Sequence, residues 1–230
     1  MNASTSSIRL MIVDDHAILA ESLKELINRQ SHMSVSATAN SGRKALRILE
    51  KDDVEIDIVL LDLSMEEEPH EPPAGIHTAR KIITELNVGR PKRIKVIALT
   101  QILDGAVIDC MHRMHVHGYL LKDCPGEELI QAIEHVGRGG RYYRNTVEEE
   151  WNRYLDKPVE KLAPPKLTHV EQELLPLIAQ GLTTKEIATI RGRTEDSIEA
   201  HRRNMMKKFE ARNAPHMISL AYNYGFIKPY

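Results

Sequence analysis

Residues 8–16 read IRLMIVDDH, a mostly apolar run that ends in two carboxylates and an imidazole. A strand buried on both faces of a parallel sheet has this nearly continuous apolar character. Amphipathic stretches with apolar residues three and four apart separate this run from four similar ones. Those four are Val35–Ala39, Ile56–Asp62, Ile94–Leu99 and Gly118–Leu121. The alternation predicts an α/β fold with a doubly wound parallel five-stranded sheet of flavodoxin-like order.

The chain changes character after a segment that contains several prolines. Residues 148–166 combine a charge run with three prolines, which cannot donate to a helix or a strand ladder. No strand pattern follows, and the spacing predicts four helices instead, at Val170–Gln180, Lys185–Ile190, Glu195–Glu210 and Pro215–Tyr224. We therefore predict a first domain over 1–147, a linker over 148–166 and a smaller all-α domain over 167–230.

The formal net charge of −2 conceals an uneven distribution along the 230 residues. Residues 161–230 hold 11 Lys/Arg and 7 Asp/Glu, whereas residues 1–160 hold 20 and 26. This positive excess favours a nucleic-acid partner for the second domain, although a solvated surface has the same composition. The sequence has no apolar stretch of about eighteen residues and no basic, apolar leader, so we expect a cytoplasmic protein with no membrane partner.

Polar residues follow the apolar runs at positions that a doubly wound sheet gathers at one rim. They are Asp14, Asp15, Asp62, Thr100 and Lys122. Clustered carboxylates repel one another, and a hard dication such as Mg²⁺ balances their charge and accepts phosphate oxygens as ligands. Asp62 is then a candidate nucleophile for a phosphoryl group. Lys122 and the Thr100 hydroxyl are candidates to hold the phosphate oxygens.

Two other groups of residues invite a chemical interpretation. His112, His115 and His117 suggest a zinc site, but no carboxylate or cysteine with ligand spacing accompanies them, which favours exposed histidines on a helix. Cys110 and Cys124 lack the spacing of a redox pair and are expected to be small apolar residues.

The second domain contains a helix-turn-helix pattern, with Gly192 in the turn between two short helices. Thr184 and Thr194 are the predicted N-caps of these helices. Apolar contacts between the helices are expected from Ile187, Ala188, Ile198 and Met205. The second helix has a basic side suited to DNA phosphates and guanine edges, formed by His201, Arg202, Arg203, Lys207 and Lys208.

Over almost its whole length the chain resembles two-component response regulators of the LuxR/NarL class. In the first domain the resemblance rests on Asp14-Asp15-His16, Asp62-Leu63, Met65, Thr100 and the run 118–123. It implies a phospho-receiver domain in which a sensor histidine kinase phosphorylates Asp62. It also implies an Mg²⁺ site formed by Asp14, Asp15, Asp62 and the backbone carbonyl of Ser64. Thr100 and Tyr119 would be switch residues, whose hydroxyl turns toward the phosphate and whose ring repacks inward.

In the second domain the resemblance is to the LuxR-type DNA-binding domain. It rests on Leu167-Thr168, Glu171, Gly181-Leu182, the run 185–188, Ile198, His201 and Lys207. It implies that Thr194–Lys208 is the recognition helix, with Glu199, Ala200 and Arg203 at base-reading positions. Lys185, Arg202 and Lys207 would lie nearer the DNA backbone. The last helix would provide a homodimer face through Met217, Leu220, Ala221 and Tyr224. Packing of these residues within the domain is the alternative, and the two interpretations are compatible.

Four positions depart from the family pattern. Glu66 replaces a proline and begins a longer acidic loop over 66–74, and Gln101 replaces a small residue after Thr100. A surface insertion costs little closure entropy, which favours a neutral loop, and the alternative is a loop that changes kinase docking or phosphate lifetime because it borders the expected phosphorylation site. Gln101 is expected to slow phosphotransfer or dephosphorylation. Glu199 stands where a basic residue is common and is able to accept from cytosine N4, which indicates a different target sequence. Val170 replaces the usual Arg of its helix.

These observations predict a two-component response regulator that acts as a DNA-binding transcription factor, not an enzyme. Phosphorylation of Asp62 would release the recognition helix or the dimer face and permit binding to a two-fold DNA site. One alternative is a DNA-binding protein whose receiver responds to a partner or ligand without phosphate. Another is an Mg²⁺-dependent aspartyl-phosphate hydrolase, which needs a carboxylate two residues beyond the nucleophile, where Ser64 stands.

Overall fold

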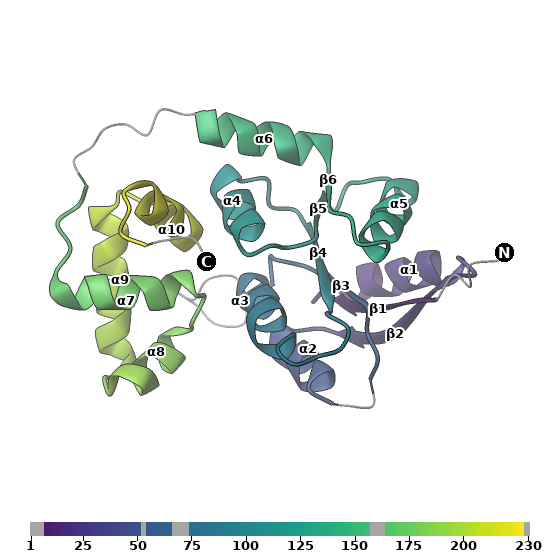
Figure 1. Cartoon of the computed structure of the whole chain (residues 1–230), viewed down its shortest axis with the longest axis horizontal. Helices are drawn as coiled ribbons and strands as arrows, with labels where there is room; N and C mark the ends of the chain where they lie inside the picture. Colours follow the sequence, from purple (N-terminus) through teal and green to yellow (C-terminus); the bar gives the residue numbers. More distant parts are fainter. Residues whose placement is uncertain (1–6, 52–53, 66–73, 157–163, 228–230) are drawn as a thin grey trace. The chain divides into compact units, whose positions relative to one another are not determined.

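The computed structural model describes residues 7–51, 54–65, 74–156 and 164–227 (Figure 1). The chain divides into two compact units. The first comprises most of residues 1–102 together with His115–Val147. The second comprises Leu103–Met114 and Glu148–Tyr230. Among the described residues, no helix is both long enough and apolar enough to cross a membrane.

The first unit is built on a parallel sheet whose strand order is β2-β1-β3-β4-β5-β6. Its strands are β1 (Ile8–Val13), β2 (Met33–Ala39), β3 (Ile58–Leu61), β4 (Lys95–Thr100), β5 (Gly118–Leu121) and β6 (Tyr142–Tyr143). The doubly wound, flavodoxin-like order of the first five strands is confirmed. The predicted number of strands is wrong, because Tyr142–Tyr143 adds a sixth strand parallel to β5.

Helices cover both faces of this sheet, with α1 and α5 on one side and α2 and α3 on the other (Figure 1). The helices of the unit are α1 (Ala17–Asn28), α2 (Gly42–Leu49), α3 (Ala74–Lys81), a π-helical turn η1 (Ile82–Leu86) and α5 (Gly126–Gly137). Ser41 caps α2 by accepting from the Lys44 N–H, as its residue type suggests.

Alternate strand residues form the core beneath α1 and α5. Leu10, Ile58 and Ile97 point to this side and pack with apolar residues of both helices, including Leu23, Ile27, Leu129 and Ile133. The intervening strand residues, such as Met11, Val59 and Val96, are also fully buried. Burial on both faces explains why these strands read as continuous apolar runs in the sequence.

A buried aspartate with two more exposed cationic partners supports the amino-terminal end of the sheet. Asp57, directly before β3, accepts hydrogen bonds from the backbone N–H and side chain of Arg9. Its carboxylate also lies 2.6 Å from the Lys92 Nζ. Burial alone would raise the pKa of Asp57, but these cationic partners lower it to about 2.

Replacing Asp57 by Asn is expected to reduce the free energy of unfolding by about 2 kcal/mol near neutral pH. The folded-state pKa lies below the unfolded value, so the contribution of Asp57 is present above about pH 4 and is lost as the pH falls toward about 2. Urea unfolding of both proteins at several pH values measures this. A stability difference that stays constant from pH 7 to about pH 3 would contradict the electrostatic explanation.

The second unit is entirely helical in its described residues. Its helices are α4 (Gly105–Arg113), α6 (Asn145–Asp156), α7 (His169–Ala179), α8 (Thr184–Arg191), α9 (Glu195–Lys208) and α10 (Ala214–Asn223). Most of α6 falls within the predicted linker, whose first part is therefore helical. Residues 157–163 of that linker lie outside the described residues.

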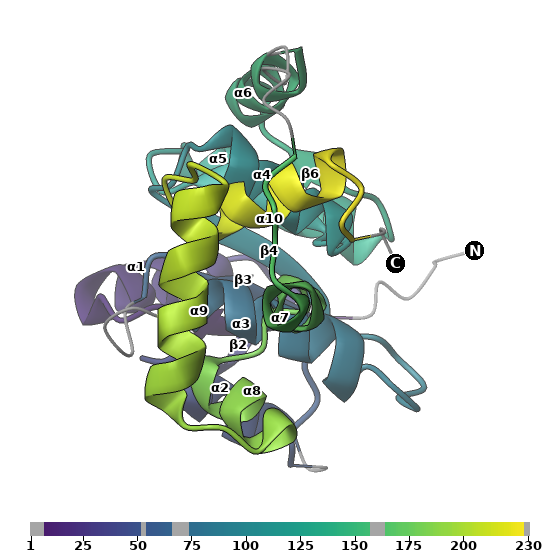
Figure 2. The ribbon, with the colours of Figure 1, turned by 90° about the vertical axis from the view of Figure 1, so that its left-hand side faces the viewer.

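Helices α7 to α10 form a helix-turn-helix domain around one apolar core (Figure 2). Ile187, Ala188, Ile198 and Met205 all belong to this core, as predicted. Gly192 ends α8 with a φ of 61°, a left-handed conformation that glycine adopts without steric cost. Thr194 caps α9 by accepting from the Ser197 N–H, but the cap of α8 is Thr183, not the predicted Thr184.

Candidate functional site

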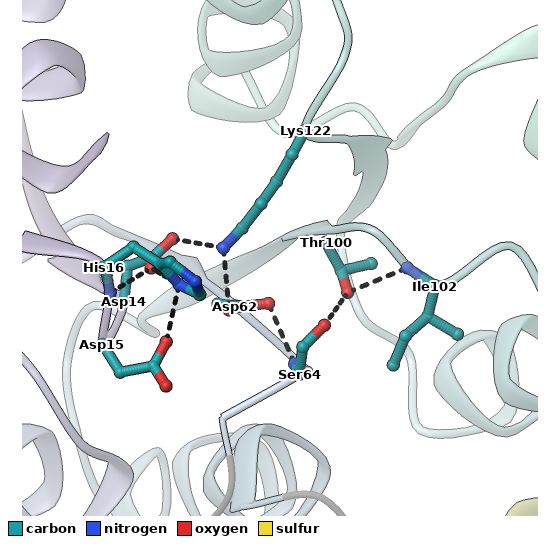
Figure 3. Close-up of polar contacts among 8 residues, drawn as sticks. All are labelled: Asp14, Asp15, His16, Asp62, Ser64, Thr100, Ile102 and Lys122. Atoms are coloured by element: carbon teal, nitrogen blue, oxygen red, sulfur yellow. Dashed lines mark hydrogen bonds and ion pairs between the residues drawn. The ribbon is translucent and has the colours of Figure 1, made fainter. Parts of the chain in front are cut away.

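The carboxyl ends of three strands bring two buried carboxylates and one ammonium together (Figure 3). Because β1 and β3 pair with Val13 beside Leu61, the next residues, Asp14 and Asp62, emerge side by side. The Lys122 Nζ, after β5, lies 2.7 Å from the Asp14 Oδ2 and 2.8 Å from the Asp62 Oδ2. Asp62 is only 1% exposed. Burial alone would lower the pKa of Lys122, but its hydrogen bonds to Asp14 and Asp62 raise it.

The two buried carboxylates belong to a group of potential metal ligands. One ligand atom from each of Asp14, Asp15, His16 and Asp62 lies within 4.8 Å of the others. Three carboxylates form the hard oxygen donor set that Mg²⁺ prefers, so the residues fit the expected metal. The His16 Nδ1 lies 2.9 Å from an Asp15 oxygen and 3.2 Å from an Asp14 oxygen. His16 was expected only as part of a motif. Its position directly after Asp14 and Asp15 was the sequence signal for its contact with their carboxylates.

A chain of hydrogen bonds leads from the Asp62 carboxylate to the loop after β4 (Figure 3). The Ser64 N–H donates to the Asp62 Oδ1, and the Ser64 hydroxyl lies 3.1 Å from the Thr100 hydroxyl. The Ile102 N–H donates to the Thr100 Oγ1. The fully buried Tyr119 donates from its hydroxyl to the Ile102 carbonyl oxygen. Both predicted switch residues therefore contact the same peptide segment.

Gly75 permits the start of α3 to approach the backbone directly after β3. A Cβ at this position would lie 2.3 Å from the carbonyl oxygen of Asp62 and 2.4 Å from the Cα of Leu63. These are backbone atoms that have no freedom to rotate away, so a larger residue would displace either α3 or the end of β3. The geometry around Asp62 depends on this glycine.

Of the two departures from the family pattern beside Asp62, the structure describes Gln101 but not Glu66. Gln101 is exposed, directly after the buried Thr100. Glu66 and most of the acidic loop lie outside the described residues. The effect of both on phosphorylation kinetics stays a prediction.

The three histidines predicted to be exposed on a helix lie in three different settings. Only His112 is in α4, while His115 adopts a left-handed backbone and His117 begins the approach to β5. His117 accepts from the Val96 N–H. Burial and the nearby Lys95 lower the pKa of His117 to about 4. These three residues do not form a metal-ligand group, because the acidic cluster around Asp62 is the only such group among the described residues.

The predicted DNA-contacting residues differ in how far their side chains are exposed to solvent. Lys185 on α8 and Arg203 and Lys207 on α9 are exposed. Glu199 and Ala200 are half-buried, and a Glu199 carboxylate oxygen lies 3.7 Å from the Arg203 guanidinium. Arg203 and Lys207, four residues apart, thus present positive charge from one side of α9.

The prediction for Arg202 needs correction. Its side chain is buried, and its guanidinium donates to the Leu182 carbonyl oxygen between α7 and α8. An arginine held in this way supports the domain and is not presented to a DNA backbone. The spacing of Arg202 from Ile198 and Met205 places it on the apolar stripe of α9, which was a signal available in the sequence.

The residues of the predicted dimer face of α10 pack within the helix-turn-helix domain, two of them only partly buried. Met217 and Ala221 are buried in its core, and Leu220 and Tyr224 pack against the same core. All four residues therefore take part in packing within the domain.

Comparison with known proteins gives a consistent assignment of both parts of the chain. The family model for the response regulator receiver domain matches residues 10–134, and that for bacterial regulatory proteins of the luxR family matches residues 165–221. The chain is 29% identical to the transcriptional regulatory protein MctR of Rhizobium johnstonii over 96% of its own length and 95% of that protein. It is 30% identical to the oxygen regulatory protein NreC of Staphylococcus epidermidis, over 93% and 96%.

A solved structure supports the same assignment. A LuxR-family two-component response regulator from Aurantimonas is 27% identical and aligns with a TM-score of 0.56, over 65% of this chain and 99% of that one. The chain therefore belongs to the response regulator family, with a receiver domain and a LuxR-type DNA-binding domain. This is a family of transcription regulators and not of enzymes, so the hydrolase alternative is not supported.

Proposed function

We propose that this protein is a transcription factor whose DNA binding is controlled by phosphorylation of Asp62. The observation that carries the proposal is the convergence of Asp14, Asp62 and Lys122, with Thr100 linked to Asp62 through Ser64. A buried carboxylate with a cation and hydroxyls close by is equipped to receive and hold a phosphoryl group. We place this activity in the cytoplasm, with a sensor histidine kinase as the phosphoryl donor.

The proposed reaction forms one bond and breaks one. A carboxylate oxygen of Asp62 bonds to the phosphorus of a phosphohistidine, the P–N bond breaks, and its electron pair stays on the imidazole nitrogen. Lys122 then pairs with a phosphate oxygen in addition to Asp14, and the Thr100 hydroxyl donates to another. Asp14, Asp15, Asp62 and the Ser64 carbonyl would hold Mg²⁺, which neutralises charge on the phosphoryl oxygens when bound.

The proposed output is the reading of double-stranded DNA by α9 in a major groove. Arg203 is exposed on this helix and suited to a guanine edge, while Lys185 and Lys207 are suited to phosphates. Glu199, beside Arg203, either orients that guanidinium or accepts from cytosine N4. We propose that a homodimer, formed through the receiver, the C-terminal helix or both, reads a two-fold site.

Gel-shift measurements with beryllofluoride, a phosphate mimic, test this function. The probe is a duplex selected by the full-length protein from a random-sequence library. With Mg²⁺ and beryllofluoride together, we expect tighter DNA binding and a larger oligomer than with either alone. If the mimic binds at Asp62 while affinity and oligomeric state stay unchanged, phosphorylation does not control this protein. An Asp62 that stays unmodified after incubation with acetyl phosphate would favour the alternative in which a partner or ligand acts instead.

A further inference from the structure

One side of α9 is fixed against the rest of the helix-turn-helix domain. Ile198 and Met205 on this side are fully buried in the domain core. Arg202 is buried between them, and its guanidinium donates to the Leu182 carbonyl oxygen at 2.6 Å. Successive residues of an α-helix are turned by about 100°, so these three positions of α9 lie within about 60° of one another. We call this the inner side of α9.

An ion pair holds the C-terminal end of the same helix. The Lys208 Nζ lies 2.6 Å from the Glu171 Oε2 of α7, and the Thr168 N–H donates to the same oxygen. Glu171 is only 2% exposed, and a buried carboxylate is stabilised only while such donors stay in place. Lys208 was expected on the basic side that contacts DNA, but it is paired within the domain. Together with the bond from Arg202, this ion pair fixes the rotation of α9 about its own axis.

The opposite side of α9 carries a row of four residues. Asp196, Arg203 and Lys207 are exposed, and Ala200 is half-buried. Their spacings of four, three and four residues place them within about 60° of one another and opposite the inner side. We call Asp196, Ala200, Arg203 and Lys207 the outer row. Because the rotation of α9 is fixed, this row is the side that the helix offers to a ligand.

Asp196 brings a negative charge to the end of this row that is expected to meet DNA bases. It lies in the first turn of α9, and the N-terminal residues of a recognition helix contact base edges. Asp196 does not cap the helix, because the Thr194 hydroxyl accepts from the Ser197 N–H instead. Within the part of the chain that the structure describes, the Asp196 side chain has no hydrogen bond and no ion pair. Its carboxylate is therefore available to a ligand.

Double-stranded DNA offers few groups that a carboxylate can bind. Its phosphates repel a negative charge, and the major-groove edge of guanine presents only the acceptors N7 and O6. Adenine places the acceptor N7 beside its amino group. Cytosine presents the N4 amino group, a donor from which Asp and Glu side chains accept. A carboxylate that faces the bases therefore favours cytosine and disfavours guanine most strongly.

We propose that Asp196 is a base-reading residue that accepts a hydrogen bond from cytosine N4 and excludes guanine from the same position. This inference rests on the proposed function and names the base that one residue of α9 selects. Arg203, about two helical turns farther along the outer row, donates to a guanine edge. The outer row thus reads bases of opposite hydrogen-bonding character at its two ends. Much of the selection by Asp196 is repulsive, because a wrong base meets its carboxylate with an acceptor.

Selection of duplexes from a random-sequence library tests this assignment with the full-length protein and its Asp196→Asn variant. The unmodified protein should select a C·G pair at one position of each half-site, and Asp196→Asn should lose that preference. Fluorescence anisotropy with the selected duplex and its single-base variants should show discrimination at this position falling about tenfold. Loss of the cytosine preference supports the assignment, with or without a new preference for adenine, whose N6 and N7 pair with an amide.

Glu195→Gln is the matched control, because Glu195 is the adjacent exposed carboxylate in the same first turn of α9. It lies about 100° away from Asp196 around the helix and outside the outer row. Both variants lose one negative charge and its favourable interaction with the helix N-terminus. Glu195→Gln should therefore share any change in stability or overall affinity but keep the cytosine preference. An equal loss of preference in both variants would assign the effect to charge alone and overturn the role of Asp196.

The outcomes separate the role of Asp196 from the proposed function when each duplex is measured with Mg²⁺, both with and without beryllofluoride. If affinity ignores beryllofluoride while Asp196→Asn loses the cytosine preference, phosphorylation control fails and the role of Asp196 stands. If beryllofluoride strengthens binding while Asp196→Asn and the unmodified protein select the same bases, only the role of Asp196 is wrong. A protein that selects no duplex under either condition would overturn both.

Discussion

Asp62→Asn is expected to abolish the incorporation of a phosphoryl group from acetyl phosphate, the largest single effect in this protein. The amide lacks the carboxylate oxygen that bonds to phosphorus, and it removes one negative charge from the proposed metal site. Intact-protein mass spectrometry measures the result as the presence or absence of one added phosphoryl group. The response of DNA binding to acetyl phosphate should disappear in the same variant.

Asp57→Asn is the matched control, because Asp57 and Asp62 are both buried aspartates that flank the same strand. Asp57 lies at the opposite end of β3 and should leave phosphoryl incorporation intact at neutral pH. Incorporation in Asp62→Asn at the level of the unmodified chain, or its equal loss in a folded Asp57→Asn protein, would show that the acceptor has been misassigned.

Arg203→Ala is expected to weaken DNA binding by about 1–3 kcal/mol and to relax the preference at one base pair. Its guanidinium is exposed on α9, whereas that of the adjacent Arg202 is buried and bonded to Leu182. Fluorescence anisotropy with the selected duplex and with single-base variants of it measures both effects. Lys207→Ala should instead weaken binding to all sequences alike and reduce the salt dependence by about one counterion.

The control for these changes is Arg29→Ala, which removes an exposed arginine directly after α1 that lies near Glu25. It lowers the net charge equally and should leave the sequence preference unchanged. An Arg203→Ala protein that still discriminates among the base variants like the unmodified chain would exclude Arg203 from base reading. Loss of binding through unfolding is identified by its circular dichroism spectrum.

The convergence of the candidate site residues was predictable because these residues occupy strand ends. Strands buried on both faces have an unmistakable apolar pattern, and a parallel sheet brings the residues that follow them to one rim. Asp14, Asp62 and Lys122 therefore meet as expected although they are far apart in sequence. The hydrogen bond between Ser64 and Thr100 was not predictable in this way, because side-chain rotamers depend on the packed structure.

For three other features, the sequence contains only a weak signal or one that depends on distant residues. Strand β6 has only two residues, too few to show a pattern, and it forms because β5 offers a free edge. Arg202 was misassigned because its charge was given more weight than its place on the apolar stripe of α9. Asp109 accepts hydrogen bonds from Trp151 and Ser219, which lie 42 and 110 residues away in sequence, so no local pattern predicts these contacts.

The short strand β6 also bears on how the protein avoids aggregation. It occupies the side of β5 that would otherwise be open, and a two-residue strand is itself too short to template the addition of a foreign strand. The seven-residue β2 is the terminal strand at the other side of the sheet. Its exposed Ser36 and Thr38 are uncharged. We therefore expect any intermolecular sheet extension to occur at β2, and a lysine at either position is expected to improve solubility without touching the candidate site around Asp62.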